Sequence, residues 1–138
     1  MNHIFKLVLA IIALSVFSAA AEVAVIVHPS NDAKIKRSDV KKLFLGKTTI
    51  FKNGNTAIPL NLKDSPTTRR YFNNKLLNRS HGQVAAIWSK LEFTGTGTPP
   101  EEKNVSEVLQ MIANNPDMIG YIDPSAVTSD VKVILTIK

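Results

Sequence analysis

Two periodicities of hydrophobic residues divide the chain into candidate strands and helices. Residues 22–27 are almost entirely apolar and rich in β-branched side chains, which predicts a strand covered on both faces of a sheet. Residues 56–62 and 131–137 alternate between apolar and polar or smaller side chains, as half-buried strands do. Residues 118–123 predict a further strand, and residues 48–51 predict a short strand or extended piece.

Helical spacing of apolar residues recurs in four segments between these strands. Each segment places large side chains three or four positions apart, which gathers them on one face of a helix. Trp88 lies in the clearest of these patterns and is expected in the core rather than in a ligand site. The four sets are Val40/Leu43/Phe44, Phe72/Leu76/Leu77, Val84/Ile87/Trp88/Leu91 and Val105/Val108/Leu109/Ile112.

Capping residues predict where these helices begin and end. Ser38 is a suitable N-cap for the first helix, and Gly46 is placed to end it. Ser80 and Gln83 have the spacing of a capping box at the start of the third helix. The Asn-Asn-Pro sequence at 114–116 stops the fourth.

Turn-forming residues mark the connections. An Asn-Gly pair at 53–54 predicts a turn, and residues 93–100 form a loop rich in Gly, Thr and Pro. Pro59 places its strand at a sheet edge, or in a position whose N–H side is free. The Glu pair at 101–102 is expected to lead directly into the fourth helix. Together the elements predict one α/β domain with a mixed β-sheet flanked by helices.

The first 21 residues have the pattern of a secretory signal peptide. A short start containing Lys6 precedes an apolar run from Leu7 to Phe17, and a small-residue segment ends at Ala21. That run is shorter than the roughly 20 residues of a membrane span. We therefore expect cleavage after Ala21 and a single periplasmic domain at 22–138, with an uncleaved N-terminal anchor as the alternative.

Charge and composition narrow the classes of partner. The chain has 17 Lys and Arg against 11 Asp and Glu, a net charge of +6, and residues 22–138 keep +5 because the leader contains one cation and no acid. Modest positive charge suits an anionic ligand, an acidic partner or an anionic surface. The cations are scattered, with few aromatic residues among them, which argues against nucleic acid. The chain has no cysteine, so disulfides, thiolate metal sites and Cys nucleophiles are excluded.

The strongest candidate for chemistry lies where a predicted strand runs into the second helix. Ser65 suits the N-cap and Pro66 the first helical position, since proline has no N–H to leave unpaired. A helix N-terminus offers unpaired N–H groups and the positive end of the helix dipole. Ser65, Thr67 and Thr68 add hydroxyl groups, and Arg69 adds a forked, charged donor. These four residues are predicted to bind phosphate, sulfate or a carboxylate. The same sequence also fits an ordinary capped helix start, and the residues alone leave both interpretations open.

Several short segments, taken in order, form a combination that is more specific than any one of them. They are the Ser-Asp-Val-Lys-Lys-Leu-Phe-Leu-Gly-Lys block at 38–47, Asn53-Gly54, Ser65-Pro66-Thr67, Ile87-Trp88, Phe93-Thr94-Gly95 and the Asn-Pro-Asp-Met-Ile-Gly-Tyr block at 115–121. This combination resembles the substrate-binding protein of the bacterial phosphate ABC transporter, and more closely its small single-domain relatives.

The resemblance implies one lobe of a type II periplasmic binding protein. In that family a Ser-Gly-Thr turn at a helix N-terminus holds the phosphate, and Ser65 and Thr67 match its Ser and Thr. Pro66 replaces the Gly and removes one N–H donor. The family's Arg, four residues before the Ser, corresponds to Asn61, and Arg69 could supply the missing charge from the other side.

Two functions therefore compete. The first is an exported anion-binding protein for phosphate uptake or sensing, with an ABC permease or a periplasmic sensor domain as its protein partner. The second is a ligand-free interaction module of a periplasmic sensor or secretion system, built on the same lobe. An enzyme is not expected, because the sequence contains no convincing nucleophile–base pair or metal-ligand spacing, and no cofactor is implied. Whether two copies pair as a homodimer stays open.

Overall fold

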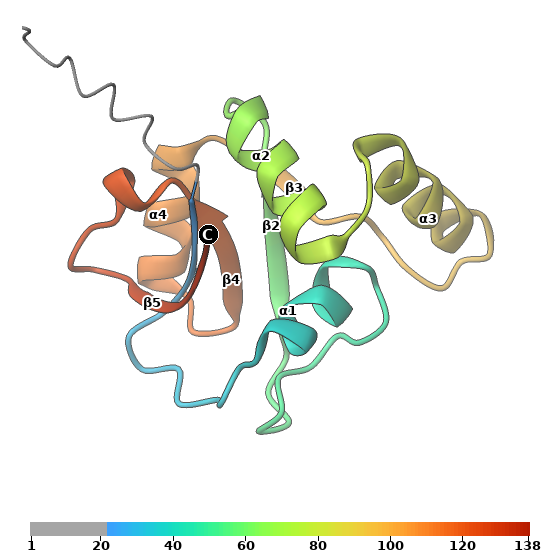
Figure 1. Ribbon diagram of the computed structural model, residues 1–138. Helices are drawn as coiled ribbons and strands as arrows, with labels where there is room; N and C mark the ends of the chain where they lie inside the picture. Colours follow the sequence, from blue (N-terminus) through green and yellow to red (C-terminus); the bar gives the residue numbers. More distant parts are fainter. Residues whose placement is uncertain (1–21) are drawn as a thin grey trace, which may run out of the picture.

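The computed structural model describes residues 22–138, which form a mixed five-stranded sheet packed against helices (Figure 1). The strands lie in the order β3-β2-β4-β1-β5. β1 is antiparallel to both β4 and β5, whereas β2 is parallel to β3 and β4. The strands are β1 (Val23–Val27), β2 (Ile58–Leu62), β3 (Glu101–Lys103), β4 (Met118–Ile122) and β5 (Lys132–Ile137).

Helices occupy the segments between the strands and confirm the predicted α/β class. They are α1 (Arg37–Phe44), α2 (Pro66–Phe72), the π-helix η1 (Asn73–Leu77), α3 (His81–Phe93), α4 (Val105–Asn114) and the 3₁₀ turn η2 (Pro124–Ala126). Among residues 22–138, no helix has the length and apolar character needed to cross a membrane. The predicted leader, residues 1–21, lies outside the described residues.

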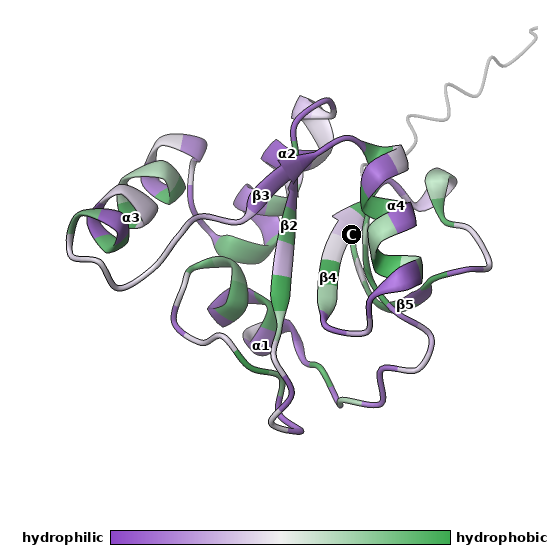
Figure 2. Cartoon of the chain, turned by 180° about the vertical axis from the view of Figure 1, so that it is seen from behind, coloured by the Kyte–Doolittle hydropathy of each residue, from purple (hydrophilic) through white to green (hydrophobic). Residues whose placement is uncertain are grey.

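Two neighbouring residues of β4 show which helices cover each face of the sheet. A Cβ placed on Gly120 would lie 3.0 Å from Val108 and 3.0 Å from Ile112, so the absence of a side chain lets α4 lie close to the strand. Tyr121 points to the opposite face, where its ring meets Phe44 of α1 and Phe72 of α2. The sheet is thus covered by α4 on one face and by α1 and α2 on the other, and Figure 2 shows hydrophobic and hydrophilic residues alternating around α4.

The sheet buries its first strand completely, as its sequence predicts. All five residues of β1 are buried, and both neighbouring strands pair with it. Pro59 lies in an interior strand, at a position where β2 pairs with β4 but not with β3. Of the two alternatives for Pro59, the free N–H side is therefore correct and the sheet edge is wrong.

The third helix lies to one side of the sheet, joined to it by irregular segments (Figure 1). Trp88 fixes it there: the indole is buried and its Nε1 donates a hydrogen bond to the Phe44 carbonyl oxygen at 3.1 Å. Gly46 ends the preceding helix α1 with φ +72°, directly beneath α3. A Cβ at Gly46 would lie 2.6 Å from Leu91 Cδ1 and 2.9 Å from Trp88 Cη2. The core role of Trp88 and the helix-ending role of Gly46 are both confirmed.

Three sequence predictions are wrong. The first helix starts at Arg37 with Lys36 as its N-cap, not at Ser38, because the Asp39 carboxylate accepts the Lys36 N–H at 2.8 Å and so sets the first turn. Of the two alternatives for residues 48–51, the strand is wrong and the extended piece is correct, since only Ile50 bridges to Thr56 across a tight turn. The Glu pair at 101–102 belongs to strand β3, where pairing with β2 overrides its helical preference.

The second helix reaches Leu77 as predicted but changes its winding on the way. It is α-helical from Pro66 to Phe72 and continues as the π-helix η1. Asn78 ends it with φ +53°, a left-handed conformation that asparagine tolerates better than most residues. The widened turn buries Asn73, whose Nδ2 has no hydrogen-bond partner.

Gly46→Ala should destabilise the fold more than Gly54→Ala does. Both glycines have positive φ, but a Cβ at Gly54 meets nothing within 4 Å, whereas at Gly46 it meets Leu91 and Trp88. We expect the Gly46 variant to lose about 1–3 kcal/mol more in the free energy of unfolding, measured by urea titration. Equal losses for the two variants would show that α3 does not pack tightly on the end of α1.

Candidate functional site

The first turn of α2 begins four residues after the last residue of β2. Ser65 occupies the N-cap and Pro66 the first helical position, both as predicted. The Ser65 hydroxyl makes no capping hydrogen bond, and its carbonyl oxygen accepts the Arg69 N–H at 3.0 Å. Ser65 and Thr68 are half-buried and Thr67 is exposed. The amides of Thr67 and Thr68 are among the first N–H groups of the helix, which have no carbonyl partner within it.

The Arg69 side chain is held by the neighbouring strand β3. Its Nη1 donates to Glu102 Oε1 at 2.7 Å and to the Leu62 carbonyl oxygen at 3.3 Å. The side chain of Arg69 is only 17% exposed, whereas that of Glu102 is 53% exposed. The Nε of Arg69 is enclosed and has no hydrogen-bond partner. The protein alone therefore leaves part of this guanidinium's donor capacity unused.

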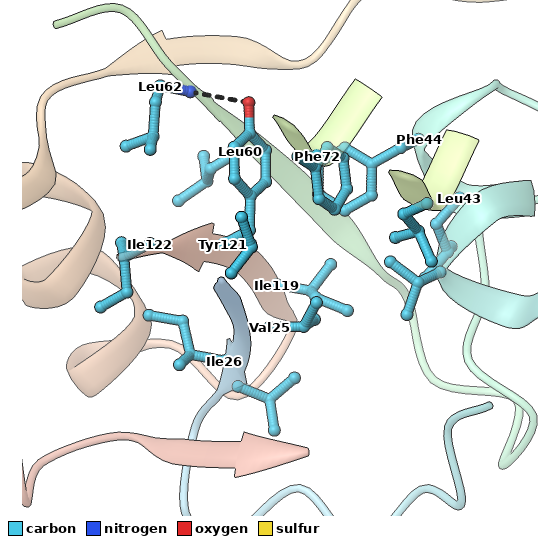
Figure 3. Packing of buried hydrophobic residues seen from close by; sticks show 14 of the residues in the cluster. Val25, Ile26, Leu43, Phe44, Leu60, Leu62, Phe72, Ile119, Tyr121 and Ile122 are labelled. Carbon is cyan, nitrogen blue, oxygen red and sulfur yellow. Dashed lines mark hydrogen bonds between the residues drawn. The ribbon is translucent and has the colours of Figure 1, made fainter. Parts of the chain in front are cut away.

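A buried polar network lies beside this arginine. The Tyr121 hydroxyl donates to Asn61 Oδ1 at 3.0 Å and accepts the Leu62 N–H at 3.4 Å, the second of which is drawn in Figure 3. The Tyr121 ring stacks on Phe72 with 3.8 Å between centroids. Burial is the main reason that the pKa of Tyr121 lies well above its ordinary value, so the phenol stays protonated and able to donate.

This network replaces part of the sheet. β2 pairs with β4 only at Ile58 and Pro59, so the end of β2 receives no ladder hydrogen bonds from β4. The Tyr121 hydroxyl reaches across instead and satisfies the Leu62 amide. Because Phe72 of α2 stacks on the same ring, one side chain fixes both the end of β2 and the helix that follows it.

Two hollows lie near the start of α2, and only one of them contains a cation. That one, of about 230 Å³, is lined by Arg69 and also by the carboxylates Glu92 and Glu102, whereas Ser65, Thr67 and Thr68 do not line it. The other is wider, about 880 Å³, and is lined by the carboxylates Asp64 and Asp130 without a cation, which makes it unsuited to an anion. The first hollow is lined by Asn61, Arg69, His81, Val84, Ala85, Trp88, Ser89, Glu92, Pro99, Pro100 and Glu102.

The structure brings Ser65, Thr67 and Thr68 together in one turn and sets the Arg69 guanidinium against Glu102. Binding of one ion by all four residues stays a prediction.

Sequence reasoning missed Glu102 because it missed β3, and it missed Tyr121 because the partner Asn61 lies 60 positions away in the sequence. Asn61, which the sequence resemblance aligns with an arginine of the phosphate-binding proteins, is buried and hydrogen-bonded to Tyr121. Within residues 22–138, no three metal-ligating side chains gather at one point.

Solved structures with a similar fold include components of phosphate ABC transporters. They include an ABC-type phosphate transport receptor from Vibrio cholerae (TM-score 0.63, 18% identity, 83% of this chain and 46% of that one). Another is a protein from Clostridium perfringens, described as a putative phosphate ABC transporter substrate-binding protein with bound phosphate. Its TM-score is 0.62 and its identity 19%, and the match covers 83% of this chain and 45% of that one. For PstS from Borrelia burgdorferi the TM-score is 0.53 and the identity 18%. The match covers 75% of this chain and 42% of that one.

These likenesses confirm the predicted fold, a mixed sheet and helices matching one lobe of a periplasmic binding protein. This chain spans less than half the length of each of these solved structures. No protein-family model matches the chain. No curated protein matches it either.

Tyr121→Phe should lower the free energy of unfolding by about 1–3 kcal/mol at neutral pH, because it leaves buried groups of Asn61 and Leu62 unpaired. The substitution should also remove part of the loss of folding stability at alkaline pH. Since burial raises the folded-state pKa of Tyr121, the stabilisation is complete below the unfolded-state value of about 10 and declines as the pH rises above it.

Urea titrations at neutral and alkaline pH would measure both effects, with Tyr71→Phe, at a half-buried position, as the matched control. An alkaline loss of stability that is the same in Tyr121→Phe and in the unmodified protein would contradict the assigned role of the hydroxyl.

Proposed function

We propose that residues 22–138 bind a small oxyanion, with inorganic phosphate as the leading ligand, at the N-terminus of α2. Ser65, Thr67 and Thr68 would contact the ion from the first turn, and Arg69 would contribute the positive charge. The sequence pattern of residues 1–21 further suggests that the protein acts after export, in phosphate uptake or sensing. An ABC permease or a periplasmic sensor domain would then receive the loaded protein.

Arg69 is the observation that carries this proposal. A buried N–H without an acceptor is unfavourable by about 1–3 kcal/mol, and the Arg69 Nε is such a group. The same arginine lines a hollow together with Asn61 and stands one turn from the helix N-terminus. Guanidinium groups bind phosphate through paired, charge-assisted hydrogen bonds. An oxyanion beside α2 would therefore supply acceptors that the protein alone does not.

The solved structures with this fold support the choice of ligand class, because they are phosphate receptors or substrate-binding proteins by name. A site formed by one lobe differs from a closed two-lobed cleft in one physical respect. Water stays in contact with the ion, which weakens each electrostatic interaction. We therefore expect weaker binding than in a receptor that encloses its ligand.

Arg69→Ala and the double variant Ser65→Ala/Thr67→Ala should both weaken phosphate binding. Losing a charge-assisted hydrogen bond of about 1.5–3 kcal/mol corresponds to roughly a 10- to 100-fold loss for the arginine variant. Arg79→Ala is the matched control, because Arg79 lies beyond the far end of the same helix and donates to the Asn78 carbonyl. Calorimetric titration at fixed ionic strength measures all three, and equal losses would indicate nonspecific charge instead of a site.

Glu102→Gln should strengthen phosphate binding. The Glu102 carboxylate holds the Arg69 guanidinium at 2.7 Å and so occupies donors that an oxyanion needs. An ion pair with one partner this exposed contributes only about 0.2–1 kcal/mol, so we expect a gain of about two- to fivefold in affinity. Glu101→Gln, at the neighbouring exposed carboxylate of β3, provides the control. Weaker binding in Glu102→Gln would show that the carboxylate positions the arginine for the ion.

The ligand-free interaction module remains the second candidate, and three observations favour it. Pro66 lacks one N–H, the Asn61 amide oxygen is committed to Tyr121, and Arg69 already has a carboxylate partner. Absence of heat with phosphate up to millimolar concentration, in both the unmodified protein and Glu102→Gln, would favour this second function.

A further inference from the structure

A local concentration of positive charge lies around α1. Residues 34–52 contain seven of the 17 cations and a single acidic residue, Asp39. Asp39 forms an ion pair with Lys52 at 3.5 Å. Within residues 22–138, no carboxylate lies within ion-pairing distance of Lys42 or Lys47. The surface beside α1 therefore keeps a net positive charge.

Two adjacent hollows lie beside α1, and the larger one contains the cations. It measures about 430 Å³ and is lined by Lys42, Lys47, Lys52 and the Lys52 partner Asp39 around the apolar side chains of Ile35 and Phe51. The smaller, about 240 Å³, lies between Pro59 and Trp88 and contains the carboxylate Glu101. Leu43 and Thr48 line both hollows, so the two are continuous along the same side of α1.

Exposed hydrophobic side chains mark the same two hollows. Ile50, at 52% exposure, lines the larger one, and Ile58, at 37%, lines the smaller one. They are two of only four large hydrophobic residues that are exposed in the part of the chain that the structure describes. Clustered apolar exposure with a polar rim is typical of surfaces that bind another molecule.

The shape and the charge identify the kind of occupant. A membrane surface would be met by protruding apolar side chains, whereas these apolar groups line concave hollows of about 430 and 240 Å³. The lysine rim attracts negative charge and disfavours a basic partner, a second copy of this basic chain included. We propose that the paired hollows bind an acidic segment of another protein, with two of its apolar side chains seated in them and its carboxylates facing Lys42 and Lys47.

Selection of a displayed library of random dodecapeptides on residues 22–138 tests this inference. We expect enrichment of peptides that combine Asp or Glu with at least two large apolar residues, and weaker binding of these peptides at high salt. Synthetic versions of the enriched peptides should lose about tenfold or more in affinity for Lys42→Glu/Lys47→Glu and for Ile50→Asp. The control variant Lys90→Glu/Lys138→Glu makes the same charge change at exposed positions outside both hollows and should bind normally.

Several outcomes would overturn the proposal. They are a failure to enrich any peptide, enriched peptides without acidic residues, and peptides whose binding survives the Lys42/Lys47 and Ile50 changes. Binding to phosphatidylglycerol vesicles that depends on Lys42 and Lys47, without peptide enrichment, would assign the surface to a membrane. Self-association in sedimentation equilibrium that Ile50→Asp abolishes would assign it to a second copy. Phosphate titration of the same variants should be unchanged, so this proposal and the anion site fail independently.

Discussion

The hydroxyl and ring of Tyr121 hold together the part of the molecule on which the candidate site depends. β2 separates from β4 after Pro59, and a strand that leaves its neighbour exposes amides that must be satisfied in some other way. Tyr121 satisfies one of them, at Leu62, while its ring packs on Phe72 of the following helix. The direction in which α2 starts is therefore set by a side chain of the neighbouring strand β4. Burial supports this role, because it raises the pKa of Tyr121 and so keeps the phenol protonated further into the alkaline range.

The positive charge of Arg69 is only partly compensated by other groups of the protein. Arg69 and Glu102 form a close pair, yet Glu102 is half exposed and the Arg69 Nε is left without an acceptor. Such a pair contributes little to stability, because water screens its exposed partner. It also requires little energy to break, so an incoming oxyanion could take the place of the carboxylate. If an oxyanion displaces Glu102 from Arg69, the ion pair is compatible with anion binding. If the ion pair persists, it favours the ligand-free role.

The sequence predicted what local patterns determine and missed what distant contacts determine. The buried strand β1, the capping box of α3 and the Ser65-Pro66 start of α2 follow from neighbouring residues, and the structure contains all three. β3 was missed because its Glu-Glu-Lys sequence has no hydrophobic pattern, and its strand conformation comes from pairing with β2 about 40 positions earlier. Missing β3 hid Glu102 as the partner of Arg69. The sequence predicted that Ser65, Thr67 and Thr68 lie in the first turn of α2. It could not predict that the Arg69 side chain turns toward Glu102.

The most direct test of the central claim is a phosphate titration of isotope-labelled residues 22–138 followed by NMR. The account predicts saturable shifts of the Thr67 and Thr68 backbone amides together with the Arg69 Nε–H, as the arginine exchanges Glu102 for the ion. Shifts spread over exposed lysines without saturation, with the Arg69 Nε–H unmoved, would contradict an anion site at the start of α2.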